Sequence, residues 1–385
     1  MDEGAIRPRG VMAGRVRMHC SEAEETEMEE QTESQWWRER HQSPYQAWQQ
    51  GEGIPVHRGS YVTDLYTAEV ADWPRIGQRG AFVNLADQEH DDGWLIEIKP
   101  GGQTEVMHHL FEAVIYVLNG RGATTIWQDG KPKQTVEWQR GTIFSPPLNC
   151  HYQHYNVDGQ QPARLISVTN APMVMNIYRD AEFFFHDTSI FPQRYNAEED
   201  FFTRPGSKMS RNHWQTNLIA DIWSFGLDTN VNRGAGGFLT QFTLSNNQMV
   251  GHCSEFPPGT YKKAHRHGVG AHVFILGGTG YSLLWFDGEL QRRKVEWKDG
   301  SVLSPRDMEY HQHFNTGPTS ARYLALRLGQ LDARHYLGYG REQPDQIEYE
   351  EEEPAIYQEY GQECAHHGAT VVLPRPGYQA RVEAR

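Results

Sequence analysis

The chain has 385 residues, 38% of them hydrophobic, and a formal net charge of -14 at pH 7. This length is enough for two domains that each bury a core, whereas the acidity argues against nucleic acid as a partner, because no basic stripe is present to neutralise phosphates. The sequence contains no run of about 18 apolar residues and no apolar signal segment, so we expect no membrane partner and a cytoplasmic location.

The first 35 residues differ in composition from the rest of the chain. Glutamate dominates residues 21–33, and apolar residues show almost no periodicity there. Such a segment cannot bury enough apolar surface to fold by itself. We therefore predict an acidic, disordered extension over residues 1–35.

Two long stretches of the chain repeat each other. The offset between matching residues is 158 up to Gly288 and 159 from Val295 onward. A repeat of this length indicates two homologous domains rather than a solenoid. The matching residues, each followed by its partner in the second copy, include Pro100 and Pro258, Gly120 and Gly278, Trp127 and Trp285, Asp129 and Asp287, Trp138 and Trp297, Gly141 and Gly300, Ser145 and Ser304, and His154 and His313.

Both copies have the pattern of all-β domains. Residues 76–172 and 236–330 contain short runs rich in Val, Ile, Thr and aromatic residues, separated by Gly, Pro and Asp-Gly turn signals. This pattern is typical of barrels and sandwiches. The predicted domains are an N-terminal domain over residues 36–172, a connector over 173–235, a C-terminal domain over 236–335, and an acidic, helical tail over 336–385.

Short helices are expected outside the two β-domains. In the connector, residues 180–185 and 217–225 have helical patterns. In the tail, a helix is predicted after the acidic run that precedes Pro354, and Gly368 is predicted to stop it. The connector is rich in aromatic residues, so we expect it to pack on the domains.

Four histidines of the second copy indicate a metal site. His265 and His267 are two residues apart, and so are His311 and His313. In an extended strand such side chains point to the same face, so both pairs can be directed into the interior of one domain.

The histidine-bearing segments resemble the two sequence motifs of the cupin family. The first motif is Gly-x5-His-x-His-x3,4-Glu-x6-Gly, and the second ends in His-x3-Asn. The chain is thus similar to two-domain cupins, and this resemblance implies two tandem jelly-roll barrels (double-stranded β-helices). The residues that match are Gly259, His265, His267 and Gly278 for the first motif, and Gly300, His311 and Asn315 for the second.

The second copy departs from the motif at its carboxylate. The position of the family's glutamate ligand is held by Ala271, and His272 follows it. Strict alternation turns His272 out of the barrel, whereas a bulge over residues 268–270 would bring it inward as a further ligand. We therefore keep His272 as a candidate ligand, with a structural role as the alternative.

The first copy has lost most of the motif. Met107, His109, Ala113 and Tyr152 occupy its ligand positions, and one histidine alone does not hold a catalytic metal. Alternation places the neighbouring His108 on a different face from His109. We expect a domain with a degenerate metal site that supports the second barrel and makes dimer contacts.

The ligand set implied by the resemblance is His265, His267 and His311, without a carboxylate. Imidazole binds Fe, Zn, Cu, Ni and Mn, but an all-histidine triad is similar to gentisate, salicylate and cysteine dioxygenase-type cupins, which favours Fe(II). The implied reaction is an O2-dependent cleavage of a C–C bond in a hydroxylated aromatic acid or a similar enolisable substrate. Gentisate-type enzymes carry their metal in the first barrel, so their substrate is not transferred to this chain.

His313 has two interpretations of equal weight. In ring-cleaving two-domain cupins, the second histidine of a similar His-x-His-x-Asn segment lies beside the substrate, so His313 is a candidate catalytic acid or base. The first copy keeps an equivalent histidine, His154, in a domain without the other ligands. That persistence favours a structural hydrogen bond.

Candidate substrate contacts are guanidinium groups and aromatic side chains. A guanidinium suits a carboxylate through a bidentate pair, and aromatic rings can line an apolar pocket. The candidates are Arg306, Arg322, Arg327, Tyr261, Tyr310 and Tyr323.

Two other classes of function stay open at this point. The chain could be an O2-independent decarboxylase, lyase or isomerase that uses Mn, Ni or Zn, as other two-domain cupins are. It could also be a small-molecule-binding protein whose metal is structural and closed by His272. The expected partners are a small-molecule substrate, O2 and further copies of the chain, as a homodimer or homotetramer.

Overall fold

The computed structural model describes residues 43–329 and 345–373, and most of this part of the chain consists of β-strands and turns. The predicted extension over residues 1–35 lies outside the described residues, as do residues 336–344 and 374–385 of the predicted tail. No helix in the described ranges is long and apolar enough to cross a membrane.

The first domain combines a large and a small β-sheet. Within the described residues, the large sheet has eight strands in the order β1-β4-β5-β11-β6-β9-β14, with β3 added beside β4, and the small sheet has the order β10-β7-β8. The strands are β1 (Val56–Gly59), β3 (Ala71–Trp73), β4 (Gln78–Leu85), β5 (Asp92–Ile98), β6 (Ala113–Asn119), β7 (Arg121–Trp127), β8 (Gln134–Gln139), β9 (Ile143–Phe144), β10 (His151–Asn156), β11 (Ala163–Thr169) and β14 (Leu218–Ile219).

The second domain repeats this arrangement. Its large sheet has the order β12-β13-β15-β16-β22-β17-β20-β2, and its small sheet has the order β19-β18-β21. The predicted all-β fold with two tandem jelly rolls is therefore confirmed. The strands are β2 (Tyr61–Val62), β12 (Ser207–Ser210), β13 (His213–Thr216), β15 (Phe238–Leu244), β16 (Met249–Phe256), β17 (His272–Gly277), β18 (Thr279–Trp285), β19 (Arg293–Lys298), β20 (Val302–Leu303), β21 (Tyr310–Asn315) and β22 (Ala321–Leu328).

Burial along the strands reveals how the sheets are layered. Residues of β7 and β8 alternate between buried and more exposed, whereas β5 and β11 are buried along their whole length. Successive side chains of a strand point to opposite faces, so complete burial requires cover on both faces. One face of the large sheet lines the interior of its own domain, and the other packs on the second domain.

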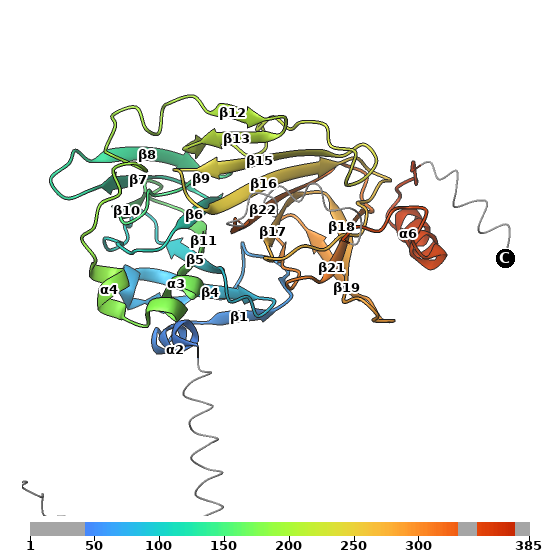
Figure 1. Cartoon of the computed structure of the whole chain (residues 1–385), viewed down its shortest axis with the longest axis horizontal. Helices are drawn as coiled ribbons and strands as arrows, with labels where there is room; N and C mark the ends of the chain where they lie inside the picture. Colours follow the sequence, from blue (N-terminus) through green and yellow to red (C-terminus); the bar gives the residue numbers. More distant parts are fainter. Residues whose placement is uncertain (1–42, 330–344, 374–385) are drawn as a thin grey trace, which may run out of the picture. The chain divides into compact units, whose positions relative to one another are not determined.

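The two large sheets share a hydrophobic core. Side chains such as Val83 and Leu95 from the first domain pack with Leu324 and Leu326 from the second. The rings of Tyr116 and Phe274 meet across this boundary with their centroids 5.8 Å apart. The four sheets therefore form consecutive layers, small, large, large and small, with the strands of both large sheets visible in Figure 1.

Some strands pair with a domain other than the segment in which they were predicted. β2, which precedes the first domain's repeat, pairs with β20, and β14, from the predicted connector, pairs with β9. The connector also supplies β12 and β13 to the second domain's large sheet. Strands from the segment between residues 173 and 235 thus belong to the sheets of both domains. The sequence did not show this, because strand pairing depends on contacts between distant segments.

The helices agree in part with expectation. α2 (Pro44–Gly51) and α3 (Ala171–Tyr178) cover the first domain, and the predicted helix near residues 180–185 is α4 (Ala181–His186), capped by the Asp180 side chain. The helix predicted over residues 217–225 is wrong, because Leu218 and Ile219 pair with β9 instead. A short 3-10 helix (Pro74–Ile76) precedes β4.

The predicted tail helix is confirmed as α6 (Pro354–His366), followed by Gly368 at a φ of +73°. α6 packs on the outer face of the second domain's small sheet, where Ile356, Tyr360 and Cys364 join the aromatic side chains Tyr281 and Phe314. Figure 1 shows this helix beside β18.

The repeated glycines mark positions where the backbone needs them. Gly120 and Gly278 have φ values of +87° and +86° in equivalent turns. A Cβ at Gly120 would lie 2.6 Å from the Cβ of Ala163, and one at Gly278 would lie 2.7 Å from the Cα of Ala321. Both the left-handed conformation and the close approach of the neighbouring strand exclude a side chain.

A buried carboxylate fastens the second domain to the first. Glu112 is 5% exposed, and its Oε2 accepts hydrogen bonds from the backbone N–H groups of Gln248 (2.6 Å) and Met249 (2.8 Å). Its Oε1 pairs with Arg194. Gln248 and Met249 are more than 130 positions away from Glu112 in the sequence, so the carboxylate connects the two halves of the chain.

We predict that Glu112→Ala lowers the free energy of unfolding by about 3 kcal/mol, because it leaves two buried N–H groups and a guanidinium without their acceptor. Urea denaturation followed by tryptophan fluorescence measures the change. Glu137→Ala, at an exposed position of β8, is the control and should change the value by less than about 0.5 kcal/mol. Equal effects of the two substitutions would contradict this role of Glu112.

Candidate metal centre

Three histidines converge in the second domain. His265 pairs with His311 on β21 through two backbone hydrogen bonds, His265 N to His311 O (3.1 Å) and His311 N to His265 O (2.8 Å). The imidazole centroids of His265 and His267 lie 4.2 Å and 4.9 Å from that of His311. One ligand nitrogen from each ring lies within 4.8 Å of the others.

The backbone orients all three rings in the same way. Nδ1 of each imidazole donates to a carbonyl oxygen two residues away: His265 to Lys263 (3.1 Å), His267 to Val269 (2.9 Å) and His311 to Glu309 (3.2 Å). These bonds select the tautomer that carries its proton on Nδ1 and leave the Nε2 lone pair free to bind a metal. Metal-binding histidines are commonly held through their other ring nitrogen in this way.

The surroundings keep the triad neutral. Desolvation, followed by the positive charge of Arg233, lowers the pKa of His265 well below its usual value, and desolvation and Arg327 do the same for His267. The pKa of His311 is lowered to about 4, again mainly by desolvation. Because a metal binds the neutral imidazole, the three rings are ready to act as ligands at physiological pH.

The position of the family's carboxylate is apolar. Ala271 is 2% exposed and packs with Val273 and Ile275 inside the second domain. Within the described residues, the group of His, Cys, Asp and Glu side chains that could hold a metal consists of the three histidines alone. The donor set therefore fits a metal bound on one face and leaves its other positions open.

His272 does not join the triad, so its suggested role as a further ligand is contradicted by the structure. Its side chain is fully buried between the domains, with Nδ1 3.2 Å from Oδ1 of Asp91 and Nε2 3.3 Å from the carbonyl of Val83. Desolvation opposes its positive charge, but Asp91, together with Asp92 and the carbonyl of Val83, raises the pKa of His272 above its usual value. β17 begins at His272, and its pairing with β22 is regular from His272 to Ile275.

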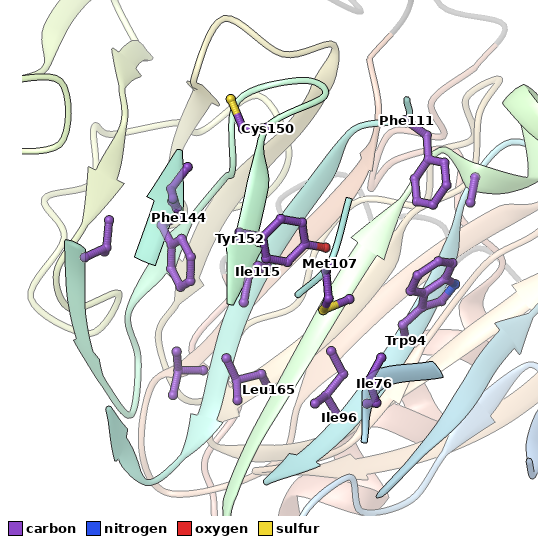
Figure 2. Close-up of a cluster of buried hydrophobic side chains, with 14 of the residues drawn as sticks. Ile76, Trp94, Ile96, Met107, Phe111, Ile115, Phe144, Cys150, Tyr152 and Leu165 are labelled. Carbon is purple, nitrogen blue, oxygen red and sulfur yellow. The ribbon is translucent and has the colours of Figure 1, made fainter. Parts of the chain in front are cut away.

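The first domain has an apolar interior at the equivalent positions. Met107 and Tyr152 form the same backbone bridge as His265 and His311, but their side chains belong to the hydrophobic core. Figure 2 shows them among Trp94, Ile115 and other apolar side chains. The described part of this domain contains no group of three possible metal ligands.

His109 is the histidine that remains at the first domain's ligand positions, and both of its ring nitrogens have hydrogen-bonding partners. His109 Nε2 lies 2.7 Å from the Tyr152 hydroxyl, and its Nδ1 donates to the carbonyl of Phe111 at 2.8 Å. The neighbouring His108 faces elsewhere and stacks on His151. These contacts support the prediction that the metal site of this domain is degenerate, which stays a prediction.

Comparison with known proteins gives a partial match to a family model and short matches in sequence. Residues 83–207, less than half of the chain, match the model described as auxin binding protein. A stretch of 85 residues is 29% identical to L-ectoine synthase of Bordetella petrii and covers 22% of this chain. It covers 60% of that relative, so the chain spans less than two thirds of the relative's length.

Solved structures match over more of the chain. Oxalate decarboxylase of Lactobacillus farciminis, in a formate complex, matches 82% of this chain and 96% of its own with a TM-score of 0.50 and 11% identity. The chain has a two-domain cupin fold. Vicilin from Corylus avellana matches 70% of this chain and 86% of its own, with a TM-score of 0.47 and 12% identity. At these identities the likeness concerns the fold alone.

His313 makes the same contact in the second cupin domain as His154 makes in the first. His313 Nδ1 lies 2.7 Å from the Ser282 hydroxyl, to which Trp297 Nε1 donates at 3.0 Å. In the first domain, His154 Nδ1 lies 2.6 Å from the Thr124 hydroxyl, to which Trp138 donates at 2.9 Å. The repetition supports the structural interpretation of His313.

The candidate substrate residues divide into two groups. Tyr323 and Arg327 are on the inward face of β22: the ring of Tyr323 lies 5.3 Å from that of His313, and Arg327 is close enough to lower the pKa of His267. The other four candidates are directed elsewhere in the cupin fold. Arg306 pairs with Asp87, Arg322 pairs with Glu255, Tyr261 stacks on Phe314, and Tyr310 stacks on Trp285.

Three residues near the triad are missing from the sequence-based candidates. His252, Ser254 and Phe256 are every second residue of β16, so their side chains point to the same face. This pattern could have identified His252 as a residue directed into the domain. Lys262 precedes His265 by three residues, and the backbone between them is irregular. The alternation of side chains along a strand therefore does not predict which way Lys262 points. Arg233 comes from the connector, where no local pattern relates it to the histidines.

A segment of the tail lies beside the triad. Gln346 pairs with His265, Ile347 N donates to the carbonyl of Ala264 at 2.9 Å, and Gln346 Oε1 accepts from Arg233 at 3.0 Å. Further along, Glu352 accepts hydrogen bonds from the Tyr261 hydroxyl (2.8 Å) and from Gln312 Nε2 (2.7 Å). Desolvation raises the pKa of Glu352 to about 8.

We predict that Ser282→Ala and Thr124→Val each lower the free energy of unfolding by about 1–2 kcal/mol, because each leaves a buried indole N–H and an imidazole without a partner. Thermal denaturation by calorimetry measures both. Thr125→Val changes the next residue of β7, on the other face, and serves as the control. A loss confined to Ser282→Ala would argue that the two sites are not equivalent.

Glu352 should make stability depend on pH. Its folded pKa lies above the unfolded value of 4.5, so its stabilising contribution is complete below that value and is lost as the pH rises through about 8. From pH ~5 to ~8.5, the wild-type free energy of unfolding should fall by on the order of 2 kcal/mol relative to Glu352→Gln. Urea denaturation across this range measures it. Glu350→Gln, at an exposed neighbour, should follow the wild type, and parallel curves for Glu352→Gln and wild type would contradict the assignment.

Proposed function

We propose that the second cupin domain is a non-haem metal-dependent dioxygenase that uses O2 to cleave a C–C bond in a hydroxylated aromatic acid or a similar enolisable substrate. His265, His267 and His311 would hold the metal, with Fe(II) as the first choice and Mn, Ni, Zn or Cu as ions that the same donors accept. The observation that carries this proposal is the set of three neutral imidazoles, each with a ring nitrogen within 4.8 Å of the others and without a carboxylate among them.

The chain's own residues prepare this site in three ways. The carbonyls of Lys263, Val269 and Glu309 fix the orientation of the rings. Apolar side chains around the triad, including Ala271 and Leu284, reduce access of bulk water. A bound Fe(II) would supply open coordination positions at which the substrate and O2 can be brought together.

A closed, structural metal site is less well supported. It requires a fourth firm ligand, and the histidine nearest in sequence, His272, is held by Asp91 at the boundary between the domains. An open site is what a catalytic metal needs, which favours an enzyme. An O2-independent decarboxylase, lyase or isomerase would use the same open site and is distinguished by experiment.

We predict that anaerobically purified protein contains about one metal ion per chain and that His267→Ala lowers the metal content at least about ten-fold, because two imidazoles do not hold the ion. Elemental analysis measures the content. Met107→Leu, at the first domain's equivalent of His265, is the matched control and should retain the metal.

Oxygen consumption with a panel of hydroxylated aromatic acids then tests the reaction. The expected result is substrate-dependent uptake by the iron-loaded protein that is abolished in His265→Ala and His311→Ala. Uptake that persists in either variant would refute the proposed site. If the protein converts one of these acids in the absence of O2, the activity is that of a lyase or decarboxylase and not of a dioxygenase.

A further inference from the structure

A lysine lies in the interior of the second domain, next to the histidines. Lys262 is 1% exposed, and its backbone N donates to the carbonyl of His313 at 2.8 Å. Its Nζ donates to the Ser254 hydroxyl at 3.0 Å and lies 5.1 Å from the ring centroid of Phe256. The neighbours Tyr261 and Lys263 are directed outward, toward the tail segment.

The charged groups that act on this lysine are positive. Arg233 is the charged group that lowers the pKa of Lys262 beyond the effect of burial, and Lys262 in turn lowers that of His313. Arg233 and Arg327 both lower the pKa of His311. Among the described residues, no carboxylate contributes to the charge environment of Lys262, His311 or His313.

Outward-facing cations of the same domain have carboxylate partners. Lys263, adjacent in sequence, pairs with Glu348 at 2.5 Å, and Arg266 pairs with Asp345 at 3.2 Å. Lys294 pairs with Glu359 and Glu363 on α6. The domain therefore has enough carboxylates to pair its outward-facing cations, and the lack of a described carboxylate partner is specific to Lys262 in the interior.

A buried ammonium group without a carboxylate opposes folding. Removing it from water is strongly unfavourable unless a counter-charge is supplied. Burial accordingly lowers the pKa of Lys262 to about 7. A single hydroxyl partner does not offset this effect, so the residue is explained better by a ligand than by packing.

The first domain supplies the comparison. Its equivalent of Lys262 is Thr104, whose backbone N donates to the carbonyl of His154 at 3.0 Å in the same register. The strand positions that carry His252, Ser254 and Tyr323 in the second domain carry apolar residues in the first. These are Trp94, Ile96 and Leu165, which Figure 2 shows together in the core.

We propose that the interior of the second domain binds the carboxylate of an acidic substrate and that Lys262 is the counter-charge that holds it. Arg233 and Arg327 add to the positive field around the triad, and the hydroxyls of Ser254 and Tyr323 lie on adjacent, paired positions within the same interior. The bound carboxylate supplies the counter-charge that no described residue provides to Lys262. The inference rests on the proposed function for the metal and names the chemical class of its substrate, a carboxylic acid.

The test is a binding measurement that requires no oxygen chemistry. Calorimetry on the protein loaded with Zn(II), a redox-inactive ion, would compare 2,5-dihydroxybenzoate and pyruvate with the amides of the same two acids. The wild type should bind at least one acid more tightly than its amide. Lys262→Met and Lys262→Gln should weaken binding of that acid about ten-fold or more and leave amide binding unchanged, since only the charge-assisted contact is lost. Lys262→Gln keeps a hydrogen-bonding partner for Ser254 and therefore separates charge from polarity.

Lys294→Met is the matched control, because it removes a lysine that pairs with Glu359 and Glu363 on α6, and it should bind the acid as the wild type does. Lys262→Met should also keep its Zn(II) and melt at the same or a higher temperature, since a desolvated charge is removed. Wild-type affinity for the acid in either Lys262 variant would overturn the inference, and so would an absence of acid binding in the wild type. A lower melting temperature with equal losses for acid and amide would assign Lys262 a structural role and overturn it as well.

The two proposals can fail independently. Binding of the acid that depends on Lys262, without any uptake of O2, would refute the dioxygenase and leave the inference standing. Uptake of O2 that Lys262→Met does not change would refute the inference and leave the dioxygenase standing.

Discussion

The packing of the two large sheets against each other is the constraint on which the rest of the structure depends. Each large sheet must be apolar on both faces, because one face closes its own domain and the other meets its partner around Tyr116 and Phe274. The strand pairings of β2 and β14 and the carboxylate of Glu112 reinforce the same boundary. This boundary also determines the fate of His272, which points to it and is held there by Asp91.

The interiors of the two domains differ in polarity, although both domains rest on the same boundary. The first is filled by Trp94, Met107, Tyr152 and other apolar side chains and contributes packing energy. In the interior of the second domain, the same positions carry histidines, a serine and a tyrosine. Lys262 adds a buried amino group there. Polar groups of this kind weaken a core, and the neighbouring domain provides a large apolar surface that compensates. A duplicated fold can in this way separate stability from chemistry.

Much of the fold and part of the site could be predicted from local patterns. The repeat, the strands and the tail helix follow from spacing, turn residues and glycines such as Gly278. The convergence of His265, His267 and His311 agrees with the expectation from alternation. The placement of Arg306, Arg322, Tyr261 and Tyr310 was not accessible, because each of these side chains is directed by a partner from a distant segment.

What the sequence determined by itself is therefore the chemistry that local geometry controls. An extended backbone has a period of two residues, so two histidines separated by one residue share a face and can meet a third histidine on a neighbouring strand. The tertiary structure alone decided the charge and the openness of the site. It brought Arg233 from the connector, turned Lys262 inward and engaged His272 elsewhere, because these outcomes depend on which distant segments pack together, and no periodicity along the chain encodes that.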